Sequence, residues 1–157
     1  MFERLPGVAP EARRALALGW LERSAGVGDP ALREALADAA CAVIADPRFA
    51  DLFAPDALAE APIAAVLAGG TVVSGTVDRL RVARDRILVA DFKTGRNAPT
   101  DPAAIPPAHL RQMAAYRDAL RVIFPGRPVE AALLYTAEPV LHVLPDALLD
   151  TYAPMGG

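Results

Sequence analysis

GTVDRLRVARDRILVADFKTG, residues 75–95, is the stretch that decides the fold of this chain. Its pattern predicts two strands joined by a short turn around residues 83–85. Side chains alternate between the faces of a strand, so Asp91 and Lys93 are expected on one face and Phe92 on the other. Charged groups in such an apolar hairpin are costly unless they bind something, so Asp78, Asp91 and Lys93 indicate a site.

These three residues have the composition of a phosphodiesterase centre. A carboxylate-bound divalent cation lowers the pKa of a bound water and stabilises charge on the phosphate. Oxygen ligands without a cysteine cluster favour Mg²⁺ or Mn²⁺ over a structural zinc ion. For Asp91 and Lys93 alone, the alternative is an ion pair that only fixes the strand register. Asp78 favours the metal interpretation.

A helix predicted over residues 107–124 supplies two more polar side chains. Gln112 and Tyr116 are four residues apart and therefore share one helical face. The Gln112 amide and the Tyr116 hydroxyl can each donate a hydrogen bond to a metal-bound water or a phosphate. Glu60 precedes the strand that leads into the hairpin and is a candidate for the same cleft, although most glutamates lie at the surface.

The order of elements predicts an α/β protein with a mixed central β-sheet flanked by α-helices. We expect one domain over residues 1–157, with a helical N-terminal part (1–57) and a core (58–157). Residues 95–107 contain four prolines and are expected to form a loop without regular structure. Beyond that loop we expect the helix over 107–124, strands over 129–136 and 139–145, and a short terminal helix.

Two helices are predicted in the N-terminal part. Leu16 and Trp20, with Leu21 as a further candidate, have the spacing of an apolar face on the first helix. The second helix is expected to begin at Asp29, a capping residue, followed by Pro30. Its predicted apolar stripe consists of four residues, namely Leu32, Leu36, Ala39 and Val43.

The net charge of −3 conceals an uneven distribution. Residues 79–127 hold ten basic and four acidic side chains, and a local basic zone around carboxylates favours a phosphate backbone as partner. Solvated surface arginines are the alternative. The basic residues are Arg79, Arg81, Arg84, Arg86, Lys93, Arg96, Arg111, Arg117, Arg121 and Arg127.

Other features of the sequence indicate where in the cell the protein is expected. The apolar runs are too short to span a bilayer, and the start of the sequence lacks the pattern of a signal peptide. The single Cys41 excludes an internal disulfide and suits a reducing environment. We therefore expect a cytoplasmic protein without a membrane partner.

The motifs GTVDRL (75–80), ADFKTG (90–95) and LRQMAAYRDAL (110–120) resemble those of the RecB-like branch of the PD-(D/E)XK nucleases. The resemblance is closer to the C-terminal nuclease domains of the AddA helicase–nuclease subunits. Further similar segments are RLPGVAPEARR and ALLYTAEPVLHVLP, so the resemblance covers nearly the whole chain. It implies a restriction-endonuclease-like core and an Mg²⁺- or Mn²⁺-dependent deoxyribonuclease, an exonuclease of DNA double-strand-break repair.

The resemblance also implies roles for single residues. Asp78, Asp91 and the backbone carbonyl of Phe92 would be metal ligands, and Lys93 would activate the water and stabilise charge. Two more residues, Gln112 and Tyr116, would support the site and the DNA backbone, whereas Glu60 matches a family glutamate of less certain role. The implied partners are DNA (a single strand or a duplex end), a helicase motor and a second helicase–nuclease subunit.

Two departures from the family pattern affect these expectations. A metal-binding histidine usually stands just upstream of the segment that here reads FERLPG, whereas His109 and His142 lie elsewhere. No phosphate-binding Gly-x-x-x-x-Gly-Lys loop occurs, so a motor would have to belong to a longer parent protein. A catalytically incomplete DNA-binding or partner-docking module is therefore an alternative, and an unrelated α/β protein with a chance Asp-x-Lys is a third.

Overall fold

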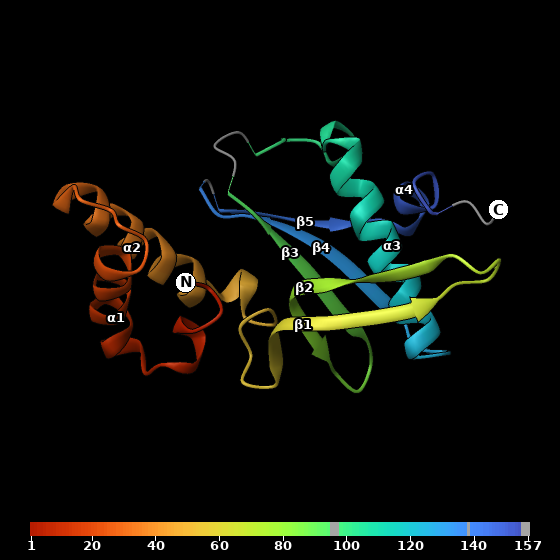
Figure 1. Cartoon of the computed structure of the whole chain (residues 1–157), viewed down its shortest axis with the longest axis horizontal. Coiled ribbons are helices and arrows are strands. Elements are labelled where there is room, and N and C mark those ends of the chain that lie inside the picture. Colours follow the sequence, from red (N-terminus) through yellow and green to blue (C-terminus); the bar gives the residue numbers. More distant parts are fainter. Residues whose placement is uncertain (95–97, 138, 155–157) are drawn as a thin grey trace. The chain divides into compact units, whose positions relative to one another are not determined.

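A computed structural model of the chain describes residues 1–94, 98–137 and 139–154 (Figure 1). The chain divides into two compact units, Met1–Pro55 and Asp56–Gly157. Of the described residues, no helix is both long enough and apolar enough to cross a membrane.

The first unit is helical. A short 3-10 turn, η1 (Leu5–Gly7), precedes helix α1 (Pro10–Arg23), and helix α2 (Pro30–Ala45) leads into η2 (Pro47–Phe49). The Asp29 carboxylate accepts a hydrogen bond from the amide of Ala31, which confirms the predicted cap of α2.

The apolar faces of these two helices differ from the prediction. Leu16 and Leu36 are 42% and 37% exposed, and Leu32 is also exposed. Leu21 and Val43 are buried as predicted, but the other buried positions are Ala17, Ala37, Ala40 and Ile44. The two helices pack against each other, and half of their buried positions are alanines. Leucines dominate a hydrophobicity pattern, so the predicted apolar face was assigned to leucines that are in fact exposed.

The second unit is a five-stranded mixed sheet of order β1-β2-β3-β4-β5. Only β3 and β4 are parallel; the other neighbours are antiparallel. This arrangement confirms the predicted α/β class with a mixed sheet and the restriction-endonuclease-like core. The strands are β1 (Ala57–Val66), β2 (Val72–Val82), β3 (Ile87–Lys93), β4 (Val129–Tyr135) and β5 (Val140–Leu144).

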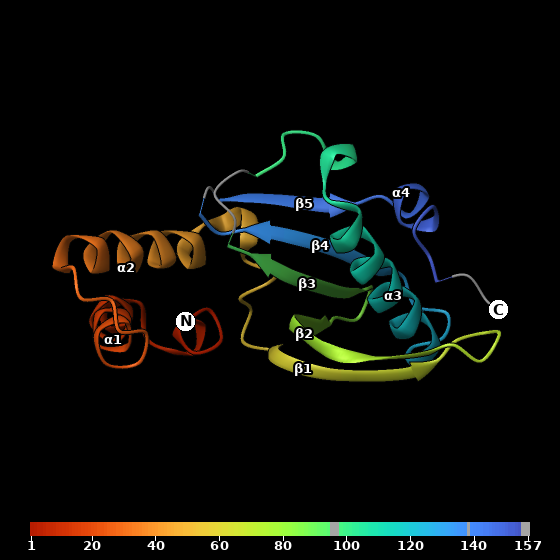
Figure 2. The same cartoon turned by 45° about the horizontal axis from the view of Figure 1, so that its top comes forward.

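Helix α3 (Pro107–Ile123) connects the two parallel strands and crosses the sheet diagonally (Figure 2). Its apolar side chains, among them Leu110, Met113 and Leu120, form one core with Val89 and Leu133 of the sheet. The chain ends in a short helix, α4 (Asp146–Asp150). Because α3 starts near the end of β3, the polar side chains of both elements can meet there.

The loop between β3 and α3 differs from the expectation of no regular structure. It contains a 3-10 turn, η3 (Pro102–Ala104), in which the Asp101 side chain accepts a hydrogen bond from the amide of Ala103. The proline-rich composition therefore does permit a short turn, since Pro102 occupies its first position. Residues 95–97, which belong to the quoted stretch and to the expected loop, lie outside the described residues.

Candidate nuclease site

The Asp91–Lys93 pair lies at the end of the central strand. Lys93 Nζ is 2.6 Å from Asp91 Oδ2, and both side chains are largely buried, with 17% and 10% of their surface exposed. Period-two alternation places both residues on the same face of β3. Removing one partner would leave the other charge buried without compensation, which is costly.

A hydrogen-bonded chain continues from Lys93 onto α3. Lys93 Nζ donates to Gln112 Oε1 at 3.0 Å, and Gln112 Nε2 donates to the Tyr116 hydroxyl at 3.3 Å. Tyr116 in turn donates to the carbonyl oxygen of Thr76 in β2 at 3.3 Å. The structure thus brings together four of the predicted site residues, because the i, i+4 spacing on α3 faces the end of β3.

Asp78 is the fifth. It lies one residue beyond the pair formed by Arg79 and Ala90, and its Oδ2 accepts a hydrogen bond from the amide of Phe92 at 2.6 Å. Asp78 is therefore next to the backbone that follows Asp91. An unrelated protein in which Asp78 lies far from Asp91 does not fit this geometry.

Glu60 lies on β1 between two register pairs, Ala59 with Arg79 and Ala61 with Val77, and thus opposite Asp78. Its φ angle is +49°, which makes it the only non-glycine residue with positive φ in the described part of the chain. A left-handed glutamate within a strand stores backbone strain of about 1–3 kcal/mol. Such strain is concentrated at functional sites in proteins.

The donor atoms are of the type that suits a hard divalent cation, since Asp78 and Asp91 carry carboxylate oxygens and Phe92 a backbone carbonyl oxygen. The described residues nevertheless contain no cluster of three or more His, Cys, Asp or Glu side chains arranged to hold a metal ion. One oxygen of Asp91 contacts Lys93 and one oxygen of Asp78 contacts the Phe92 amide. The chemistry of the donor set fits the cation, whereas binding would require these side chains to adjust.

The predicted basic zone is only partly available for an external phosphate. Arg81 pairs with Asp56 at 2.9 Å, and Arg86 with Asp85 at 3.2 Å. Arg117 is 2% exposed and is surrounded by Asp118, Asp146 and Asp150. These arginines form ion pairs within the chain, which the sequence pattern alone could not distinguish from phosphate binding. Arg96 lies outside the described residues.

Sequence reasoning missed His109, which lies on the first turn of α3, three residues before Gln112. Burial lowers its pKa, and so does the Lys93 ammonium, while Asp91 opposes the shift. The imidazole therefore lies within the electrostatic field of the Asp91–Lys93 pair. The spacing to Gln112 and Tyr116, at i+3 and i+7, was a signal that could have identified it.

The composition contained a second signal. Lys93 is the only lysine among the 16 basic residues of the sequence; the others are arginines. Arginine is bulky and forked, whereas lysine carries a compact charge with three donors. A chain that otherwise uses arginine has lysine at this position, where Nζ contacts both the Asp91 carboxylate and the side-chain amide oxygen of Gln112.

His142 and Tyr135 form a separate contact near the site. His142 Nε2 lies 2.8 Å from the carbonyl oxygen of Pro99, which ties the loop before α3 to β5. The rings of Tyr135 and His142 meet edge to face, with 5.8 Å between their centroids. His142 is 8% exposed, as expected for a packed residue of an edge strand.

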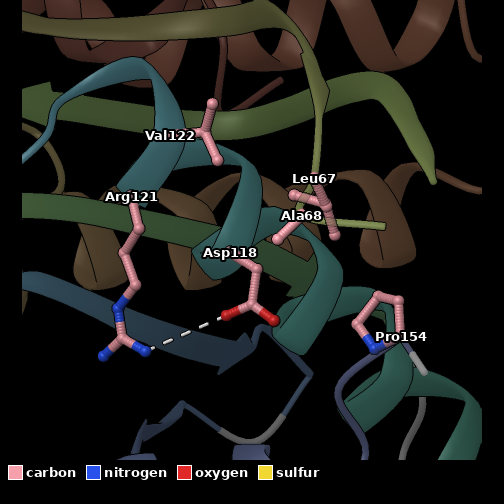
Figure 3. A pocket seen from close by; sticks show the side chains of 6 residues that line it. All are labelled: Leu67, Ala68, Asp118, Arg121, Val122 and Pro154. Atoms are coloured by element: carbon pink, nitrogen blue, oxygen red, sulfur yellow. Dashed lines mark ion pairs between the residues drawn. The ribbon is translucent and has the colours of Figure 1, made fainter. Parts of the chain in front are cut away.

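A cavity of about 290 Å³ lies at the other end of α3. Figure 3 shows the ion pair between Asp118 and Arg121 on the helix, with Leu67 and Ala68 of the β1–β2 connection also in the lining. Val122 and Pro154 complete its lining. None of the predicted site residues contributes to this lining, so the cavity is distinct from the Asp91–Lys93 site.

The chain was compared with protein-family models, curated proteins and solved structures. Residues 2–148 match the family model described as "PD-(D/E)XK nuclease superfamily". A search of curated proteins gives no match. Among solved structures, the chain is similar to the one titled "Crystal structure of SSO0001", with 13% identity, coverage of 91% of this chain and 70% of that chain, and a TM-score of 0.41.

Proposed function

The chain belongs to the PD-(D/E)XK nuclease superfamily, and from this premise we propose that it is a divalent-metal-dependent deoxyribonuclease. The observation that carries the proposal is the continuous set of contacts from Asp91 through Lys93 to Gln112 and Tyr116. A buried ion pair that served only to fix strand register would not need two further polar partners on another element.

In this proposal Asp78, Asp91 and the Phe92 carbonyl hold Mg²⁺ or Mn²⁺. The cation supplies Lewis-acid stabilisation of the phosphate and a water of lowered pKa when it is bound. Glu60 is proposed as a supporting residue, because its strained backbone stands opposite Asp78.

Lys93 positions the attacking water and stabilises the charge that develops on the phosphate. Gln112 accepts a hydrogen bond from Lys93 and so restricts the position of the ammonium group. Tyr116 anchors Gln112 to β2 through Thr76. Such support matters because a small displacement of a reacting group costs a large factor in rate.

We further propose that the chain is a RecB-like nuclease domain of the AddA type, which acts as an exonuclease in the repair of DNA double-strand breaks. The order and spacing of the motifs around Asp78, Asp91 and Gln112 support this assignment. Its substrate would be a single strand fed by the helicase motor of a longer parent chain, with a second helicase–nuclease subunit as partner. Cys41 as the only cysteine supports a reducing, cytoplasmic setting.

A second candidate function is a DNA-binding or partner-docking module with an incomplete metal centre. The observation in its favour is that no three acidic or histidine side chains among the described residues are arranged around a common point. Both candidate functions are compatible with the observed fold, but they predict different behaviour toward divalent cations.

Cleavage and metal binding together distinguish the two. A labelled single strand is incubated with Mg²⁺ or Mn²⁺ and the wild-type chain, Asp91→Asn, Lys93→Ala or the exposed control Asp85→Asn. The nuclease proposal expects cleavage by the wild type and the control, and a loss of at least about 100-fold in the other two. Mn²⁺ calorimetry is run in parallel.

Equal cleavage by the wild type and Asp91→Asn would refute the assigned site. An absence of both cleavage and Mn²⁺ binding, with strand affinity retained, would instead identify the binding module. Thermal unfolding of each variant checks that Asp91→Asn, which breaks a buried pair, is still folded at the assay temperature.

A further inference from the structure

His109 has no role in the proposed mechanism, yet it lies on the same face of α3 as Gln112 and Tyr116. Positions i and i+7 are almost eclipsed on a helix, and i+3 lies on the neighbouring row. Gln112 contacts Lys93 directly, and His109 is one turn closer to the start of the helix. The charges of Lys93 and Asp91 also affect the pKa of its imidazole, in opposite directions.

The end of the sheet at which His109 lies is a common place for ligands. Strands β3 and β4 are parallel, and Lys93 and Tyr135, their last residues, stand opposite each other in the register. Ligands of α/β proteins bind outside the carboxyl ends of parallel strands. Helix α3 begins beyond Lys93 and places His109 at this end.

The ring of His109 is held with one nitrogen inward. The residue is half-buried, and Nδ1 is buried without a hydrogen-bond partner among the described residues. Nε2 is therefore the nitrogen that can meet a ligand from solution. Burial and the Lys93 ammonium lower the pKa of the ring, which favours the neutral imidazole with its single N–H donor.

We propose that His109 binds a phosphate group of the DNA strand through Nε2, beside the phosphate attacked at Lys93. The inference rests on the proposed nuclease function and adds a strand-binding residue to it. Phosphate oxygens accept hydrogen bonds from neutral donors as well as from cations, and such contacts fix the register of a strand on the protein. His109 then contributes to binding equally before and during the reaction.

Three variants separate the two ring nitrogens. His109→Ala removes both, His109→Gln places an amide near the position of Nε2, and His109→Asn places one near Nδ1. Affinity for a short fluorescein-labelled single strand is measured by anisotropy in EDTA, so that no cleavage occurs. Strands with and without a 5′-phosphate are compared, which separates a backbone phosphate from a terminal one.

The proposal expects His109→Ala and His109→Asn to bind either strand about tenfold more weakly, as for the loss of one hydrogen bond to a charged group. His109→Gln should regain most of the affinity. With Mn²⁺, His109→Ala should raise KM by a similar factor and leave kcat nearly unchanged. Thermal midpoints of the variants report whether the fold is kept.

Unchanged affinity in a folded His109→Ala variant would overturn the proposal. So would a fall in Mn²⁺ affinity measured by calorimetry without a fall in strand affinity, which would make His109 a metal ligand. If His109→Ala lost affinity only for the 5′-phosphorylated strand, the bound group would be a terminal phosphate, which would contradict the proposed contact with a backbone phosphate. If Asp91→Asn still cleaves while His109→Ala binds weakly, the nuclease site is wrong and the strand-binding residue stands.

Discussion

The hydroxyl of Tyr116 lies directly over Gly75, only 2.8 Å from the point where a β-carbon on that residue would be. The missing side chain leaves room for Tyr116 to reach the carbonyl oxygen of Thr76, the next residue of β2. A glycine in the middle of a strand weakens it, so its presence here is explained by the approach of the ring. Gly75 thereby affects Gln112 and Lys93 without touching either.

Gly75→Ala should displace the Tyr116 ring. Because the ring is 9% exposed and the Cε1 atom is also within 3.0 Å, we expect a loss of about 1–3 kcal/mol in unfolding free energy. Cleavage should fall as well, since Gln112 loses its anchor. Urea denaturation and the cleavage assay measure the two effects.

Gly28→Ala is the matched control, because no atom lies within 4 Å of the point that its β-carbon would occupy. It should change stability by only a few tenths of a kcal/mol. Adding Tyr116→Phe to Gly75→Ala should recover part of the lost stability by removing the closest atom. Wild-type stability and activity in Gly75→Ala would contradict the proposed anchoring.

Lys93→Arg should abolish cleavage although it preserves the charge. Lys93 Nζ contacts Asp91 and Gln112 from a single point, which a planar guanidinium cannot reproduce. A displacement of about 1 Å at a reacting group costs roughly 100-fold in rate. Arg111→Lys, at an exposed position of α3, is the reverse exchange and should have little effect. Comparable turnover by Lys93→Arg and wild type would show that only charge is required.

Arg117 holds α4 against α3. Its 2% exposed side chain contacts carboxylates of Asp118, Asp146 and Asp150. Arg117→Met should cost about 2 kcal/mol, less than for a fully buried pair because two of these carboxylates are well exposed. Arg121→Met, at a 40% exposed position facing Asp146, should cost less than about 1 kcal/mol. Chemical denaturation of the two variants provides the comparison, and equal losses would contradict it.

Tyr135 should make the fold sensitive to alkaline pH. Burial raises the pKa of its hydroxyl above the ordinary tyrosine value of 10.0, so the folded state disfavours the phenolate that forms in the unfolded chain. This contribution to stability is complete below pH 10 and is lost as the pH rises through the folded pKa. Tyr135→Phe should therefore lose less stability above pH 10 than the wild type.

The same substitution removes a buried hydroxyl without a hydrogen-bond partner among the described residues. At neutral pH we expect Tyr135→Phe to be as stable as the wild type or slightly more stable. Unfolding free energies from pH 7 to 11 test both expectations. Parallel pH curves for the two proteins would show that another tyrosine or a basic group determines the alkaline limit.

Local rules predicted the parts of the candidate site that depend on local geometry. The alternation of a strand joins Asp91 to Lys93, and one helical turn joins Gln112 to Tyr116. The exposure of Leu16 was not predictable in this way, because the packing of α1 and α2 selects alanines. The spacing along α3 shows only that His109 shares a helical face with Gln112, whereas its proximity to Lys93 depends on the crossover of α3 over the sheet.

The parallel pairing of β3 with β4 has a consequence for how the protein is made. Lys93 and Tyr135 are neighbours in the register, yet the ribosome synthesises the whole of α3 between them. Until β4 has emerged, the nearly continuously apolar strand β3 pairs with β2 alone, and its other edge is unpaired. The contact of Lys93 with Gln112 forms only after α3 has been synthesised, and nascent chains that end within α3 are the species most in need of a chaperone.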